Sequence, residues 1–117
     1  MGVQRRIQTQ LVNGVTVVTF VDRKILDAAN IRELGDELSA LVEQDGLTSL
    51  VLDFQAVQFL SSAALSKLIV LDRKVKGKSG KLVLCSLKPE IQEVIAICRL
   101  PFDIRSSVND ALAVFKS

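Results

Sequence analysis

The segment TSLVLDF, residues 48–54, decides the fold class of this 117-residue chain. It is a short, nearly continuous apolar run flanked by turn-forming residues, a pattern typical of a strand that is covered on both faces in a parallel sheet. The segment KLVLCSL, residues 81–87, has the same pattern. A helix beginning near Ser62 is predicted between them, so the centre of the chain has the strand–helix–strand order of a parallel α/β unit.

An antiparallel hairpin is predicted ahead of this unit, in IQTQLVNGVTVVTF, residues 7–20. Asn13-Gly14 separates its two strand-like halves, and Asn-Gly is the dipeptide that best supplies the two positive φ angles of a type I′ turn. Residues 29–46 then predict a helix, with Asn30 and Glu33 spaced like a capping box and Gly46 as a stop. Its apolar stripe consists of Ile31, Leu34, Leu38, Leu41 and Val42.

The C-terminal third of the chain continues the alternation of strands and helices. Pro89 lies where a proline at the first helical position is favoured, ahead of Ile91, Val94, Ile95 and Cys98. Residues 102–104 predict a short edge strand, and Ser107 predicts the N-cap of a last helix that carries Val108, Leu112 and Phe115. We therefore expect one α/β domain over residues 1–117, a small mixed sheet with an N-terminal antiparallel hairpin and mostly parallel strands after it.

Composition makes several function classes improbable. Fifteen Lys and Arg against thirteen Asp and Glu give a formal net charge of +2, too balanced to predict nucleic acid or an acidic membrane as the partner. The chain has no histidine, which removes the commonest general base and the favoured nitrogen ligand of zinc. We therefore expect no enzyme activity, no cofactor and no metal site.

The two cysteines, Cys85 and Cys98, lie in apolar patterns and are not spaced as metal ligands, so both are predicted to be buried, reduced thiols. The chain has neither the basic and apolar regions of a secretory signal nor an apolar run of the roughly 20 residues that span a bilayer. The expected location is the cytoplasm.

The segment VQFLSSAALSKL, residues 57–68, places two adjacent hydroxyls at the start of the central helix. At about 100° per residue, the side facing the core is predicted to carry Ala64, Leu68, Leu71 and Val75. The opposite side is predicted to carry Ser62, Ser66, Arg73 and Lys76, together with Ile69 and, at its edge, Val70. Either the apolar stripe is simply wide, or Ile69 and Val70 anchor a partner, with Arg73 selecting its charge at the rim.

The two serines also have alternative interpretations. Ser61 or Ser62 is the N-cap of the helix, which explains one hydroxyl. The other is well placed for phosphorylation, because a helix N-terminus tolerates an anion and the modified group carries roughly two negative charges. A catalytic serine is disfavoured because no histidine is present to activate it.

With these elements in order, nearly the whole chain resembles the STAS domain, specifically the anti-sigma factor antagonist family of bacterial regulators. In that family an apolar strand ends in an acidic residue, and a loop then leads to Asp-Ser-Ser/Thr-Gly-Leu. The segment LVLDFQAVQFLSSAAL, residues 50–65, is similar to this pattern, with Asp53 ending the strand and Leu65 in the first helical turn.

The resemblance assigns the serine that a partner kinase phosphorylates to Ser62. The family's preceding aspartate falls on Ser61, its second hydroxyl on Ala63 and its glycine on Ala64, so three positions depart from the pattern. Alanine in place of glycine suits a helix interior. The missing acid implies weaker recognition by the kinase and makes Ser61 an alternative acceptor.

The family's Gly-x-Leu-Asp segment resembles Lys24-Ile25-Leu26-Asp27, which lacks the glycine. The resemblance implies that Asp27 lies near the serine on the partner-binding surface; the alternative is that Asp27 only caps the following helix. The predicted partner-binding residues are Asp27, Ser61, Ser62, Ser66, Ile69, Val70 and Arg73.

The sequence is compatible with three functions. The resemblance implies an antagonist that binds an anti-sigma factor of the ATP-binding serine kinase type and is released by phosphorylation on Ser62, with a phosphatase as a candidate further partner. The missing acid at Ser61 favours instead a scaffold or regulatory subunit of another pathway that is not phosphorylated. The third function is a small ligand-binding or catalytic domain. A nucleotide site is disfavoured, because a glycine-rich phosphate-binding loop follows a strand and leads into a helix, whereas Gly77 and Gly80 precede a strand.

Overall fold

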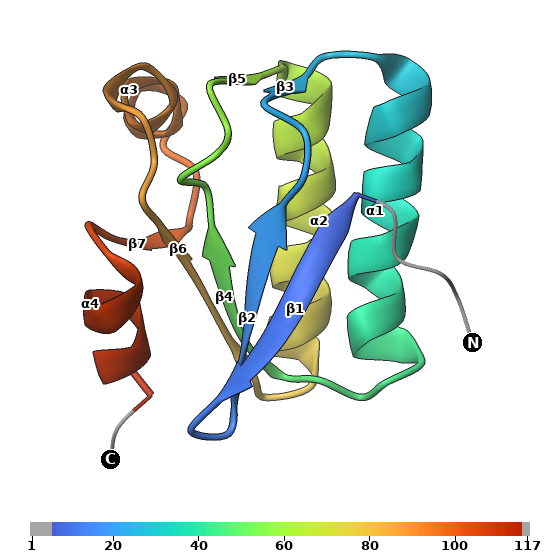
Figure 1. Ribbon diagram of the computed structural model, residues 1–117, viewed down its shortest axis with the longest axis vertical. Helices are drawn as coiled ribbons and strands as arrows, with labels where there is room; N and C mark the ends of the chain where they lie inside the picture. Colours follow the sequence, from blue (N-terminus) through green and yellow to red (C-terminus); the bar gives the residue numbers. More distant parts are fainter. Residues whose placement is uncertain (1–5, 116–117) are drawn as a thin grey trace.

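The computed structural model describes residues 6–115 as an α/β fold (Figure 1). The strands are β1 Ile7–Val12, β2 Val15–Phe20, β3 Lys24–Ile25, β4 Ser49–Asp53, β5 Phe59–Leu60, β6 Lys81–Cys85 and β7 Asp103–Arg105. The helices are α1 Ala28–Glu43, α2 Ser62–Gly77, α3 Pro89–Ile97 and α4 Val108–Ala113.

The main sheet has the strand order β1-β2-β4-β6-β7. Strand β1 is antiparallel to β2, and the turn between them has positive φ angles at Asn13 (52°) and Gly14 (82°), as a type I′ hairpin requires. All further pairs in this sheet are parallel, with Val17 beside Val51 and Val51 beside Val83 in the register. The predicted hairpin, edge strand and mostly parallel continuation are therefore confirmed.

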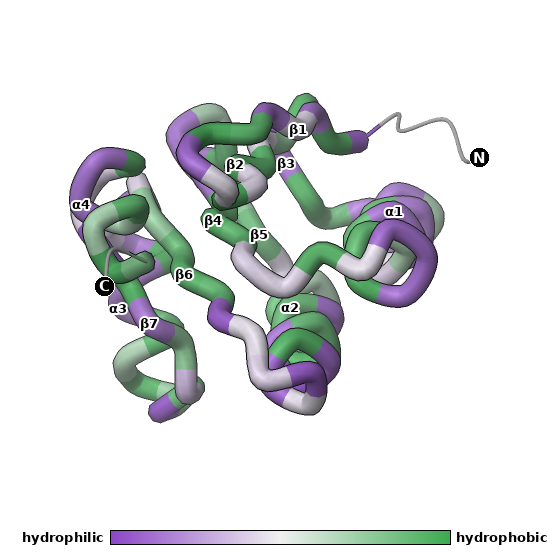
Figure 2. Tube along the Cα trace, turned by 90° about the horizontal axis from the view of Figure 1, so that it is seen from below, coloured by the Kyte–Doolittle hydropathy of each residue, from purple (hydrophilic) through white to green (hydrophobic). Residues whose placement is uncertain are grey.

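Two hydrophobic clusters lie on opposite faces of this sheet. Figure 2 shows α1 and α2 on one side and the short helix α4 on the other. The larger cluster joins alternate strand residues to α1, α2 and α3, and Phe20 stacks on Phe54 in it with 4.6 Å between ring centroids. The smaller cluster consists of Val15, Val17, Val51, Val83, Cys85 and Ala111. The alternation of side chains along a strand explains how one apolar run serves both clusters.

Both cysteines are free thiols, and the predicted burial is confirmed for Cys85 and wrong for Cys98. Cys85 is buried, and loss of solvent raises the pKa of its thiol to about 11. Cys98 is exposed because α3 ends at Ile97 and buries only the narrow stripe formed by Ile91 and Ile95. The predicted stripe of α3 was therefore too wide.

Candidate partner-binding site at the start of helix α2

A second, two-stranded sheet joins the segments that precede α1 and α2. Strands β3 and β5 pair in parallel, with Ile25 beside Leu60 in the register. The backbone N–H of Ser61 donates to the Ile25 carbonyl at 3.1 Å. Asp27 and Ser62 each lie two residues beyond that pair, so this small sheet sets the two helix starts side by side. Sequence patterns missed it, because a strand of two residues shows no alternation.

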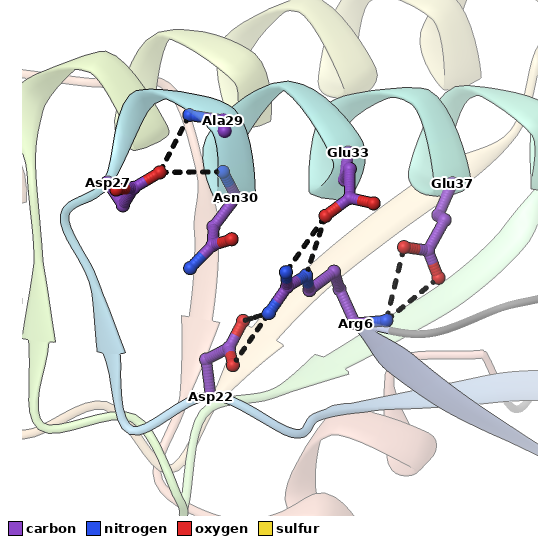
Figure 3. Close-up of polar contacts among 7 residues, drawn as sticks. All are labelled: Arg6, Asp22, Asp27, Ala29, Asn30, Glu33 and Glu37. Carbon is purple, nitrogen blue, oxygen red and sulfur yellow. Dashed lines mark hydrogen bonds and ion pairs between the residues drawn. The ribbon is translucent and has the colours of Figure 1, made fainter.

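Asp27 is the N-cap of α1. Its Oδ1 accepts hydrogen bonds from the backbone N–H groups of Ala29 (2.8 Å) and Asn30 (3.2 Å), as Figure 3 shows. The capping box predicted for Asn30 and Glu33 is therefore wrong, because the helix begins at Ala28 and Asn30 already lies in its first turn. The cap explains one role of this carboxylate without requiring a partner.

Glu33 belongs to an ion cluster that ties the start of β1 to α1 (Figure 3). The Arg6 guanidinium lies 2.9 Å from Glu33 and 3.2 Å from Asp22, while the Arg6 backbone N–H donates to both carboxylate oxygens of Glu37. The hydrogen bond with Glu33 and the negative charges raise the pKa of Arg6 above its ordinary value. The cluster leaves no local pattern in the sequence, since its members are far apart in the chain.

The two adjacent serines differ in their contacts. The Ser61 Oγ accepts a hydrogen bond from the Ala64 backbone N–H at 3.2 Å, so Ser61 is the N-cap of α2. Ser62 is the first helical residue and is exposed, and its hydroxyl has no hydrogen-bond partner among residues 6–115. Its carbonyl accepts the Ser66 hydroxyl at 3.1 Å. One hydroxyl is thus explained by capping and the other is not.

Helix α2 has the two sides expected from its sequence. Ala64, Leu68, Leu71 and Val75 are buried. Ser62, Ser66 and Arg73 are exposed, Val70 is 45% exposed and Ile69 is half-buried. Steps of three or four residues return to the same side of a helix. One stripe of α2 is therefore formed by Ser62, Ser66, Ile69 and Arg73, and Val70 lies beside it.

Lys76, also exposed on α2, is engaged within the chain. Its ammonium lies 2.9 Å from a carboxylate oxygen of Asp72 and 3.4 Å from the Pro101 carbonyl. Asp72 is buried, and the sequence does not reveal this because Asp72 begins the charged run Asp72-Arg73-Lys74. Lys76 therefore has a structural role, unlike Arg73.

A depression of about 360 Å³ lies between the starts of α1 and α2. It is lined by Leu26, Ala28, Ile31, Arg32, Ser61, Ser62, Ala63 and Lys67. Leu26 is 54% exposed and adds apolar surface at its border. The cations Arg32 and Lys67 were not singled out by sequence, because they come from different helices and only the packing of α1 against α2 brings them together.

The family model of the STAS domain matches residues 6–111. The chain belongs to the STAS domain family. A curated relative, BtrV of Bordetella bronchiseptica, named as an anti-sigma factor antagonist, is 34% identical over 95 residues, which cover 80% of this chain and 81% of BtrV. The family predicted from LVLDFQAVQFLSSAAL is thus confirmed.

Solved STAS structures share the architecture. An anti-sigma factor antagonist domain from Planctomyces limnophilus superposes with a TM-score of 0.81 at 22% identity, covering 95% of this chain and 98% of the other. An anti-sigma factor antagonist from Mycobacterium paratuberculosis gives a TM-score of 0.81 at 25% identity, with 95% and 93% covered. Phosphorylated SpoIIAA from Bacillus gives 0.72 at 16% identity, with 94% and 99% covered. The predicted fold class is confirmed by these likenesses.

Residues 6–115 contain no group of three or more His, Cys, Asp or Glu side chains placed to hold a metal ion. Over the same residues, every helix is too short or too polar to cross a bilayer.

Proposed function

We propose that this protein is an anti-sigma factor antagonist. Unphosphorylated, it binds an anti-sigma factor of the ATP-binding serine kinase type, which releases the sigma factor; phosphorylation of Ser62 ends the complex. The observation that carries the proposal is the exposed Ser62 hydroxyl, which has no partner within residues 6–115 while its neighbour Ser61 supplies the helix cap. The likeness to BtrV supports the partner class.

The proposed docking surface joins the helix stripe to the start of α1. Half-buried Ile69 and exposed Val70 offer apolar contact, and exposed Arg73 offers charge at its rim. The set is completed by Asp27, Ser61, Ser62 and Ser66. All of these residues act by binding, so the proposed function requires no catalytic residue and no cofactor in this chain. In this proposal the protein acts as a single domain in the cytoplasm.

Phosphorylation changes this surface without unfolding the domain. The Ser62 side chain is exposed and makes no hydrogen bond within the described chain, so adding a phosphate there disrupts no bond of the fold. The group carries roughly two negative charges and is strongly hydrated. Burying it under a partner, close to apolar contacts, costs desolvation energy that the unmodified serine does not. The complex therefore weakens while the fold persists.

The test is the affinity of a purified anti-sigma factor kinase from the same cells for three forms of the protein. Wild type and Ser62→Ala should bind with similar affinity in the presence of a non-hydrolysable ATP analogue. Ser62→Asp should bind at least about tenfold more weakly, a difference of roughly 1.4 kcal/mol. Equal affinities of Ser62→Ala and Ser62→Asp would contradict the switch.

A second candidate function is favoured by Ser61, which stands where the family has an acidic residue before the acceptor. In this alternative the protein is a scaffold or regulatory subunit that docks without being modified. Intact-mass measurement on protein from its native cells distinguishes the two. Phosphate on Ser62 supports the switch. The scaffold is supported if no phosphate is found even after incubation with ATP and the kinase, and if light scattering shows a large assembly whose size ATP and the kinase leave unchanged.

A further inference from the structure

Two cations from different helices line the depression that contains Ser62. Arg32 extends from α1 and Lys67 from α2, and both are exposed. Among the described residues, neither side chain makes a hydrogen bond or an ion pair, whereas nearby Lys74 is paired with Glu43. The depression therefore combines two positive charges with Ser62, the serine that does not cap the helix.

The position of Lys67 depends on a glycine of the facing helix. A Cβ added at Gly35 would lie 3.0 Å from the Lys67 Cδ and 3.4 Å from its Cγ and Cε, so the lysine stem lies directly against α1 at this point. Arg32 precedes Gly35 by three residues and lies on the same side of that helix. The missing side chain at Gly35 thus lets the Lys67 stem lie against α1, beside the depression that Arg32 also lines.

We propose that a phosphate on Ser62 is held within its own chain by Arg32 and Lys67. The inference rests on the proposed function in taking Ser62 as the acceptor. A phosphoserine has three acceptor oxygens, and arginine and lysine are the side chains that pair best with them. The volume of the depression, about 360 Å³, is ample for the group.

Within the described chain, the other charged groups near the depression do not occupy Arg32 or Lys67, so both cations are available to pair with the phosphate. The Asp27 carboxylate, in the connection before α1, accepts two backbone N–H groups through its Oδ1. Asp36 lies one turn beyond Arg32 on α1, and no ion pair joins the two. Of the two short strands that precede the helices, β5 has no charged residue, and β3 has the cation Lys24, whose ammonium lies over the Phe59 ring. Among residues 6–115, therefore, no carboxylate forms an ion pair with either cation of the depression.

The test installs phosphoserine at position 62 by genetic code expansion and follows its ³¹P resonance from pH 4 to 8. The second pKa of the phosphate, ordinarily about 6, should lie at least about half a unit lower than in the double variant Arg32→Gln/Lys67→Gln, since nearby cations favour the dianion. The matched control Arg73→Gln removes a cation of α2 outside the depression and should leave this pKa within about 0.2 unit of wild type.

A third variant tests the geometry rather than the charge. Gly35→Ala keeps both cations but displaces the Lys67 stem, so it should raise the phosphate pKa part of the way toward the value in the double variant. If the phosphate titrates identically in wild type and the double variant, the inference is wrong. It is equally wrong if Arg73→Gln has as large an effect as the double variant.

Because the phosphate is introduced without a kinase, this experiment does not depend on the anti-sigma factor. A lowered phosphate pKa that the double variant abolishes supports the intramolecular site even if the anti-sigma factor binds both forms equally, an outcome that would overturn only the proposed function. Conversely, loss of binding on phosphorylation with an unshifted pKa would overturn only the intramolecular site.

Discussion

The two ends of helix α2 are built in opposite ways. At its start, Ser61 caps the helix, Ser62 is exposed and a depression opens toward α1. At its end the chain turns tightly into β6, where the Gly80 N–H donates to the Val75 carbonyl (2.9 Å) and the Lys81 N–H to the Thr48 carbonyl (2.8 Å). A Cβ on Gly80 would lie only 2.3 Å from the Thr48 carbonyl oxygen.

This difference separates stability from function along one helix. The close-packed end holds α2 on the sheet through backbone contacts that tolerate no extra atom. The open end lies beyond the carboxyl ends of the parallel strands, where connections in α/β folds commonly form binding sites (Figure 1). Substitutions should therefore affect folding at one end and partner binding at the other.

The largest effect is expected from Gly80→Ala. Its Cβ would clash with the Thr48 carbonyl and with Val75, which costs roughly 1–3 kcal/mol or more of unfolding free energy. Gly77→Ala is the matched control, because nothing lies within 4 Å of its added Cβ and alanine is the better helix former by up to about 1 kcal/mol. Urea unfolding of both variants measures the difference, and equal stabilities would contradict the close approach at Gly80.

An intermediate effect is expected at the open end, from Ser61→Ala. Loss of the N-cap bond to Ala64 should lower the unfolding free energy by about 1 kcal/mol. Ser62→Ala should change it by less than about 0.5 kcal/mol, since the exposed hydroxyl has no partner in the described part of the chain. Thermal or urea unfolding checks the pair. The assignment of the cap to Ser61 is wrong if Ser62→Ala proves the more destabilising.

The smallest effect concerns the ion pair between Glu43 and Lys74, 2.9 Å apart, which joins the C-terminal halves of α1 and α2. The hydrogen bond from Lys74, followed by its charge, lowers the pKa of Glu43 below its ordinary 4.5. A carboxylate whose folded pKa is lowered adds stability above pH 4.5, and that stability is lost as the pH falls through the folded pKa. Both side chains are partly exposed, so the effect is small.

Urea midpoints of wild type and Glu43→Gln between pH 3 and 6 test this sign. The wild type should be the more stable protein near pH 6, and the difference should shrink toward pH 3. Lys74→Gln should reduce the same pH dependence. A difference that grows as the pH falls would show that the pair does not act as described.

Much of the fold could be predicted from local patterns. The Asn13-Gly14 hairpin, the buried strand before Asp53 and the N-cap at Ser107 each depend on neighbouring residues, and the structure confirms all three. Predictions failed where the outcome depended on residues far apart in the chain. Glu33 contacts Arg6 instead of capping its own helix, and Cys98 lies beyond the narrow buried stripe of α3.

The candidate site divides in the same way. Sequence alone determined that two serines begin an amphipathic helix after a buried strand, because hydrophobic periodicity and capping preferences act over a few residues. Only tertiary structure decided which serine is the cap, and that Arg32 and Lys67 share a depression with the other. The pairing of β3 with β5 and the contact of Lys67 with Gly35 bring these groups together, and such contacts between distant segments leave no local pattern in the sequence.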